Sequence, residues 1–152
     1  MEKAIYFDMD GTLANLYGVE GWLDKLREYD ASPYLEAATL LNMQALAHRL
    51  NALQRKGYTI GIISWLSMES TAEYDEATRA AKLAWLKAHL GSVKFDEIHL
   101  VAYGEKKSTL AKVKGGLLFD DNIKVRKEWT KNNPTGWACS EKEILAVLEQ
   151  LK

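Results

Sequence analysis

Short apolar runs alternate with amphipathic segments along this chain, and that alternation predicts an α/β fold. The runs are rich in β-branched, aromatic and leucine side chains and have the length of buried strands. They span residues 4–7, 58–64, 98–102, 116–119 and 135–138. Apolar positions at helical spacing predict helices over residues 40–56, 72–90 and 141–151. Helices that alternate with strands in this way predict a mostly parallel sheet covered on both faces and joined by right-handed crossovers.

One segment, residues 15–38, does not follow the alternation. Its aromatic residues, Tyr17, Trp22, Tyr29 and Tyr34, lie among charged residues, and a helix is expected only at residues 21–29. Because the segment directly follows the first strand, we expect it to lie over the carboxyl end of that strand, where open α/β sheets bind ligands. A chain of 152 residues suits one domain. We therefore predict a single domain over residues 1–152 with a small lid at about 15–38.

Composition and charge give no signal for nucleic acid or membrane. The formal net charge is −1, and no apolar run approaches the roughly 18 residues of a membrane span. The single cysteine, Cys139, cannot form an internal disulfide, and the N-terminus passes into a strand pattern without the features of a signal peptide. We therefore expect a cytoplasmic protein. The lid aromatics could contact substrate or a partner chain equally well, so the oligomeric state is left open.

Two carboxylates, Asp8 and Asp10, follow the first strand. They start on the same side of an extended chain, and Gly11 then allows a sharp turn. A pair placed in this way could share a divalent cation or divide the roles of nucleophile and proton carrier. Because Asp-Gly is also a common turn dipeptide, this fragment alone favours neither interpretation.

A second carboxylate pair, Asp120 and Asp121, follows the fourth strand. Adjacent buried carboxylates repel each other unless a cation or hydrogen-bond donors compensate. Asp121 could cap a helix that starts near Ile123, but capping explains only one of the two residues. Together with Asp8 and Asp10, they indicate an oxygen-rich magnesium site.

At this point the sequence resembles the haloacid dehalogenase-like (HAD) phosphatases over almost its whole length. Residues 8–13 (DMDGTL) are similar to the first motif of that superfamily, and Ser64, which ends a strand, is similar to the second. A lysine before the fourth strand and residues 117–121 (LLFDD) are similar to the third and fourth motifs. The resemblance implies a three-layer, Rossmann-like fold with a minimal cap.

The resemblance also implies a mechanism. Asp8 would attack phosphorus and form an aspartyl-phosphate, while Asp10 would protonate the leaving oxygen and later activate water. Mg²⁺ would be held by the Asp8 carboxylate, the Asp10 carbonyl and the Asp120 carboxylate. Asp121 would orient a metal-bound water or the lysine. Ser64 and the lysine would bind the phosphoryl oxygens.

The lysine has two candidates, Lys106 and Lys107, in residues 104–108 (GEKKS). The resemblance favours Lys106, because Gly-x-Lys followed by Leu110 is closer to the family pattern.

The substrate is expected to be a small phosphorylated molecule. A shorter resemblance, over residues 82–86 (KLAWL) and 98–100 (IHL), is to the 5′(3′)-deoxyribonucleotidase branch and implies a nucleoside monophosphate. Trp65 directly follows Ser64 and is a candidate substrate contact. The small lid would also leave room for a large phosphorylated substrate. The alternatives in function are phosphoryl transfer to an acceptor other than water, and a non-catalytic phosphate-binding or regulatory module.

Overall fold

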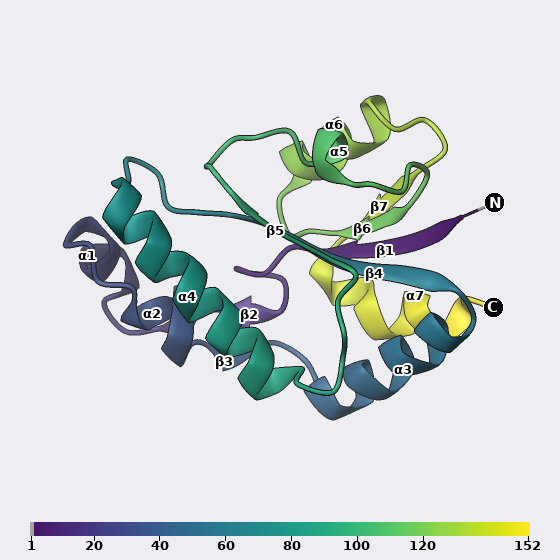
Figure 1. Cartoon of the computed structure of the whole chain (residues 1–152), viewed down its shortest axis with the longest axis horizontal. Coiled ribbons are helices and arrows are strands. Elements are labelled where there is room, and N and C mark those ends of the chain that lie inside the picture. The colour runs from purple at the N-terminus through teal and green to yellow at the C-terminus, as the bar shows by residue number, and fades with distance from the viewer. Residues whose placement is uncertain (1) are drawn as a thin grey trace.

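The computed structural model describes residues 2–152 and is built on a five-stranded parallel sheet (Figure 1). Its strands are β1 (Lys3–Phe7), β4 (Tyr58–Trp65), β5 (Glu97–Val101), β6 (Leu117–Phe119) and β7 (Trp137–Cys139). Their order across the sheet is β5-β4-β1-β6-β7, and every neighbouring pair is parallel. The predicted parallel sheet is confirmed. Strands β1 and β6 lie side by side near its centre, although 109 positions separate Thr12, after β1, from Asp121, after β6.

Helices cover both faces of this sheet. They are α3 (Met43–Arg55), α4 (Ala72–His89), α5 (Lys107–Leu110), α6 (Ile123–Lys131) and α7 (Ile144–Gln150), the last preceded by the 3-10 turn η2 (Glu141–Glu143). Alternate residues of β1 face opposite sides, as period two requires. Ile5 and Phe7 pack with α3, α7 and the second half of α4, whereas Ala4 and Tyr6 pack with α6. The result is the predicted three-layer architecture. Within residues 2–152, no helix is long and apolar enough to span a membrane.

Capping residues set where these helices begin. Asn42 accepts a hydrogen bond from the Ala45 amide at 3.0 Å, so α3 starts at Met43 rather than at the predicted residue 40. Thr71 likewise accepts from the Tyr74 amide at the start of α4. The last predicted helix opens with a capping box formed by Ser140 and Glu143, as its sequence indicates.

The lid region leaves the core after β1 and returns before α3. It contains β2 (Ala14–Asn15), the 3-10 turn η1 (Leu16–Gly18), α1 (Trp22–Arg27), α2 (Ser32–Glu36) and β3 (Ala38–Thr39). The short antiparallel pair between β2 and β3 joins Asn15 to Ala38 at its base. Tyr34 packs with Leu16 and with Tyr74 of α4, so the lid rests on the first half of that helix (Figure 1). The sequence pattern predicts α1 but not α2 or the strand pair.

Candidate active site

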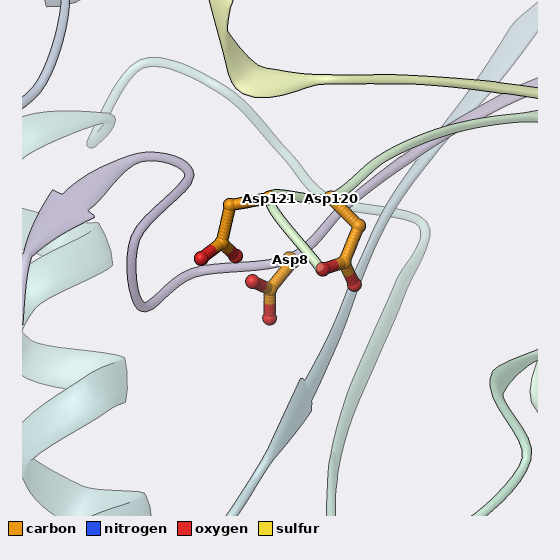
Figure 2. A group of neighbouring side chains, drawn as sticks. All are labelled: Asp8, Asp120 and Asp121. Atoms are coloured by element: carbon orange, nitrogen blue, oxygen red, sulfur yellow. The ribbon is translucent and has the colours of Figure 1, made fainter. Parts of the chain in front are cut away.

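Three carboxylates meet where β1 and β6 end at the same edge of the sheet. The Asp8 amide donates to the Phe119 carbonyl at 3.0 Å, which extends the β1–β6 pairing to the first residue after the strand. Ligand oxygens of Asp8, Asp120 and Asp121 all lie within 4.8 Å of one another. Figure 2 shows Asp8 between the other two side chains, with the carboxylates gathered at this edge. The two strand ends that the sequence predicts to carry the site, those of β1 and β6, are therefore adjacent in space.

Lys107 supplies the positive charge nearest to this cluster. Its Nζ lies 3.0 Å from Asp8 Oδ1 and 2.7 Å from Asp120 Oδ2, and its side chain is only 2 % exposed. Burial by itself would lower the pKa of Lys107, but the two carboxylates outweigh burial and raise it. The ammonium group is therefore held in its charged form between Asp8 and Asp120.

The preference for Lys106 over Lys107 is not supported by this geometry. Lys106 is the N-cap residue of α5, its side chain is exposed, and its carbonyl accepts from Thr109. Lys106 has the extended backbone conformation of an N-cap, whereas Lys107 is the first residue of the helix, so the two side chains leave the chain in different directions. The structure turns Lys107 inward and leaves Lys106 in solvent.

The electrostatics of the cluster favour a cation. Burial, followed by the charge of Asp8, raises the pKa of Asp120 to about 6 and that of Asp121 to about 8. One buried lysine does not fully offset three carboxylates, and a divalent ion would. Carboxylate oxygens are the hard ligands that Mg²⁺ prefers, so the donor set of Asp8, Asp120 and Asp121 fits this ion.

The loop after β1 holds the cluster together. Thr12 Oγ1 lies 3.0 Å from Asp8 Oδ2 and 3.2 Å from Asp121 Oδ1, and it accepts from the Asp121 amide at 3.2 Å. Gly11 has a φ of +81°, and a Cβ there would collide with the side chains of Asp121 and Tyr17. The turn therefore needs glycine both for its backbone conformation and for space beside Asp121.

Asp10 lies apart from the three clustered carboxylates and pairs with a different lysine. Lys82 Nζ lies 2.8 Å from Asp10 Oδ2, and the same atom donates to Ser64 Oγ and to the Trp65 carbonyl, each at 2.8 Å. Burial raises the pKa of Asp10, and the charge of Lys82 opposes that rise. Ser64 is fully buried and, among residues 2–152, its side chain reaches Asp10 only through Lys82.

The sequence pattern alone predicts no role for Lys82 or Thr12. A signal for Lys82 does exist, because it continues the buried stripe of α4 formed by Tyr74, Thr78 and Trp85. A lysine in such a stripe needs a buried partner. The sequence does not say which partner that is, since Asp10 lies 72 positions away.

A pocket of about 540 Å³ opens above these groups. Its floor includes Asp8, Asp10, Lys107, Asp120 and Asp121, and its walls are largely aromatic and apolar. The aromatic wall residues are Tyr17, Trp22, Tyr29, Tyr34, Trp65 and Tyr103. Trp65 packs against Tyr103 with ring centroids 4.9 Å apart, and Lys107 Nζ lies 5.3 Å from its ring. Trp65, which the sequence predicts as a candidate substrate contact, thus lines the pocket.

The fold has clear counterparts among solved structures. A D,D-heptose 1,7-bisphosphate phosphatase from B. bronchiseptica, complexed with magnesium and phosphate, matches with a TM-score of 0.57 and 13 % identity, covering 97 % of each chain. The corresponding phosphatase from Burkholderia thailandensis matches with a TM-score of 0.53 and 14 % identity, covering 90 % of this chain and 75 % of its own. A HAD family enzyme from Bacteroides thetaiotaomicron has a TM-score of 0.53 and 11 % identity over 91 % of this chain and 93 % of its own.

These similarities define the fold class. The chain has the three-layer α/β fold of the HAD phosphatases, which confirms the resemblance seen in the sequence at the level of the fold. No family model and no curated protein matches the sequence. The resemblance to the deoxyribonucleotidase branch therefore stays a prediction.

Proposed function

We propose that this protein is a magnesium-dependent phosphatase that hydrolyses a phosphate monoester through an aspartyl-phosphate on Asp8. The observation that carries the proposal is the placement of Asp8 on the pocket floor, within 3.0 Å of Lys107 and beside Asp120 and Asp121. A buried carboxylate with a fixed lysine and a cation site beside it suits an anionic nucleophile that must approach an anionic phosphate. The HAD fold supports the same reaction class by analogy.

In the first step, a carboxylate oxygen of Asp8 forms a bond to phosphorus as the bond from phosphorus to the leaving oxygen breaks. Asp10 donates a proton to that oxygen, so the alcohol leaves neutral. The Lys107 ammonium, 3.0 Å from Asp8 Oδ1, is placed to attract the phosphoryl oxygens as the group transfers. Ser64 is the second proposed phosphate ligand.

In the second step, water attacks phosphorus and the bond to the Asp8 oxygen breaks. Asp10, now a carboxylate, takes the proton from this water, which restores the starting state and releases inorganic phosphate. Asp8, Asp120 and Asp121 would hold Mg²⁺ with their side chains. When bound, this ion would offset the repulsion between carboxylate and phosphate.

The aromatic pocket walls favour a substrate with a planar ring system, which supports a nucleoside monophosphate. Tyr17 and Trp22 pack edge to face at 5.0 Å on the lid, while Trp65 and Tyr103 form a second aromatic pair on the core. Aromatic rings give favourable stacking surfaces to a nucleobase. The volume of about 540 Å³ lies in the range of pockets that hold small molecules.

Phosphate release from a panel of esters tests the proposal. The panel should contain nucleoside 5′- and 3′-monophosphates and sugar phosphates, each assayed with Mg²⁺ and with a chelator. We expect magnesium-dependent release, highest on nucleotides, that disappears in Asp8→Asn and survives in the matched control Asp24→Asn, an exposed lid residue. Release that persists in Asp8→Asn would rule out the nucleophile. A preference for sugar phosphates would reject the nucleotide assignment alone.

The same assay separates the alternatives. Adding an alcohol or nucleoside acceptor and following phosphorylated product distinguishes phosphoryl transfer from hydrolysis. A non-catalytic module would bind phosphate without turning over any ester. The presence of Asp8, Asp10, Asp120 and Lys107 together at one pocket argues for turnover.

A further inference from the structure

Lys82 is a buried cation to which the proposed reaction assigns no step. It lies in the middle of α4, its side chain is 1 % exposed, and it forms an ion pair with the Asp10 carboxylate at 2.8 Å. Asp10 itself is 17 % exposed and lines the pocket. Lys82 thus lies behind a group that faces the pocket.

The hydrogen bonds of Lys82 are fully used. An ammonium group has three N–H donors and no acceptor. The three donors have three acceptors at 2.8 Å, namely Asp10 Oδ2, Ser64 Oγ and the Trp65 carbonyl oxygen. Lys82 therefore has no N–H left for a substrate oxygen in this arrangement. Its action must pass through the groups that it holds.

The consequences differ for the two side chains. Asp10 has one carboxylate oxygen fixed by Lys82, which leaves the other toward the leaving oxygen or a water. The Ser64 hydroxyl accepts from Lys82, but Ser64 is fully buried and is not among the residues that line the pocket, so Lys82 acts on the pocket through Asp10. The ammonium group therefore sets the orientation of the proposed proton carrier, Asp10.

The lid closes this arrangement from above. The ring of Tyr34, on α2, has its centroid 5.0 Å from Lys82 Nζ, and its hydroxyl hydrogen-bonds to Ser67. Tyr34 is itself buried. The aromatic face of Tyr34 therefore makes a cation–π contact with the Lys82 ammonium from the lid.

We infer that Lys82 is a positioning residue for the proposed phosphatase, which holds Asp10 in place for proton transfer to the leaving group. The inference rests on the proposed function. It distinguishes Lys82 from Lys107: Lys107 touches the nucleophile, whereas Lys82 acts on proton transfer. A buried ion pair that only stabilises the fold is the alternative.

Leaving-group dependence separates these two roles. The value of kcat/KM reports the steps up to departure of the leaving group, and 4-nitrophenolate departs with little need of a proton, whereas an alkoxide needs one. Lys82→Met should lower kcat/KM for an alkyl phosphate by about 100-fold, the lower end of the contribution of general acid catalysis, but should change 4-nitrophenyl phosphate much less. Lys87→Met, exposed on the same helix, is the matched control and should change neither.

Equal losses on both esters would overturn the inference, because a structural role does not depend on the leaving group. If Lys82→Met does not fold, the comparison uses a second pair of variants, Asp10→Asn alone and Asp10→Asn combined with Lys82→Gln. Asp10→Asn removes the carboxylate charge and the proton that Asp10 would transfer. The ratio of kcat/KM values for the two esters should then be the same with and without Lys82→Gln. A further change in that ratio would show that Lys82 does not act through Asp10. A wild-type chain that turns over neither ester would overturn the proposed function and this inference with it.

Discussion

Lys107 Nζ lies 3.0 Å from Asp8 Oδ1, although 99 positions separate these residues in the chain. The lysine begins the short helix α5, and the aspartate directly follows β1. The same ammonium reaches Asp120 after β6 at 2.7 Å. This single cation joins the two strand ends from which the proposed site is built.

Substitution of Lys107 should lower turnover far more than substitution of its neighbour Lys106. We expect Lys107→Met to lower kcat by at least about 100-fold, because charge stabilisation at the transferring phosphoryl group is lost. Lys106→Met should stay near wild type, since Lys106 is exposed on the other side of the helix start. Steady-state kinetics on one ester with both variants measures the difference. Similar losses in the two variants would contradict the assignment of Lys107.

Magnesium should stabilise the fold more at pH 8 than at pH 5. The pKa values of Asp120 and Asp121, raised to about 6 and about 8, mean that both carboxyls hold protons at pH 5 in the metal-free chain. Mg²⁺ must displace those protons, so its affinity rises with pH. Without metal the folded chain binds more protons than the unfolded chain in this window, so its stability falls as pH rises.

Thermal unfolding with Mg²⁺ and with a chelator at the two pH values measures this effect. Asp121→Asn should weaken both the shift in Tm and its dependence on pH. A shift in Tm that is equal at pH 5 and pH 8 would argue against magnesium binding by these carboxylates.

A second pH effect should arise at Glu97, the first residue of β5. This buried carboxylate accepts from the Tyr6 hydroxyl at 2.7 Å and the Lys112 amide at 3.1 Å, and lies 2.9 Å from His99. Burial alone would raise the pKa of Glu97, but the hydrogen bonds from His99, Tyr6 and the Lys112 amide outweigh it and lower the pKa. The stabilisation is therefore present above the ordinary carboxyl pKa and is lost as pH falls through the lowered value.

Glu97→Gln should cost about 1–3 kcal/mol of the free energy of unfolding at pH 7, because hydrogen bonds to a buried charged group are lost. The difference from wild type should shrink in acid. Urea unfolding over a pH series measures it, with the exposed Glu73→Gln as control. A cost that grows in acid would contradict the lowered pKa.

Tyr29 should be a substrate contact rather than a source of stability. It follows α1 with a φ of +59°, where the Asp30 amide bonds to the Lys25 carbonyl at 2.8 Å, a helix ending that usually carries glycine. Its ring packs edge to face on Tyr74 at 5.5 Å and lines the pocket. Relief of the backbone conformation, about 1–2 kcal/mol, should offset much of the lost ring contact in Tyr29→Gly.

We therefore expect the free energy of unfolding of Tyr29→Gly to lie within about 1 kcal/mol of the wild-type value, while KM for an aromatic substrate rises several-fold. Tyr29→Phe keeps the ring and should keep KM. Chemical denaturation and steady-state kinetics on the same preparations provide the two measurements. An unchanged KM in the glycine variant would remove Tyr29 from the substrate site.

The sequence by itself determined the sheet and the ends of its strands. Alternating apolar runs and helical periodicities are local properties, so the five strands are found within one or two residues of their predicted positions. Asp8 and Asp120 could be placed at one edge because the strands of a parallel sheet all point the same way. The sequence pattern does not predict the lid helix α2, because five residues span little more than one helical turn and cannot show a period.

Tertiary structure alone decided which lysines lie at the candidate site. Lys106 and Lys107 are adjacent and alike, and only the docking of α5 against the sheet decides which one turns inward. The pairing of Lys82 with Asp10 depends on how α4 packs beside β4, a contact between segments far apart in the chain. Such long-range contacts form only when the whole core is assembled, so a local pattern of side chains cannot predict them.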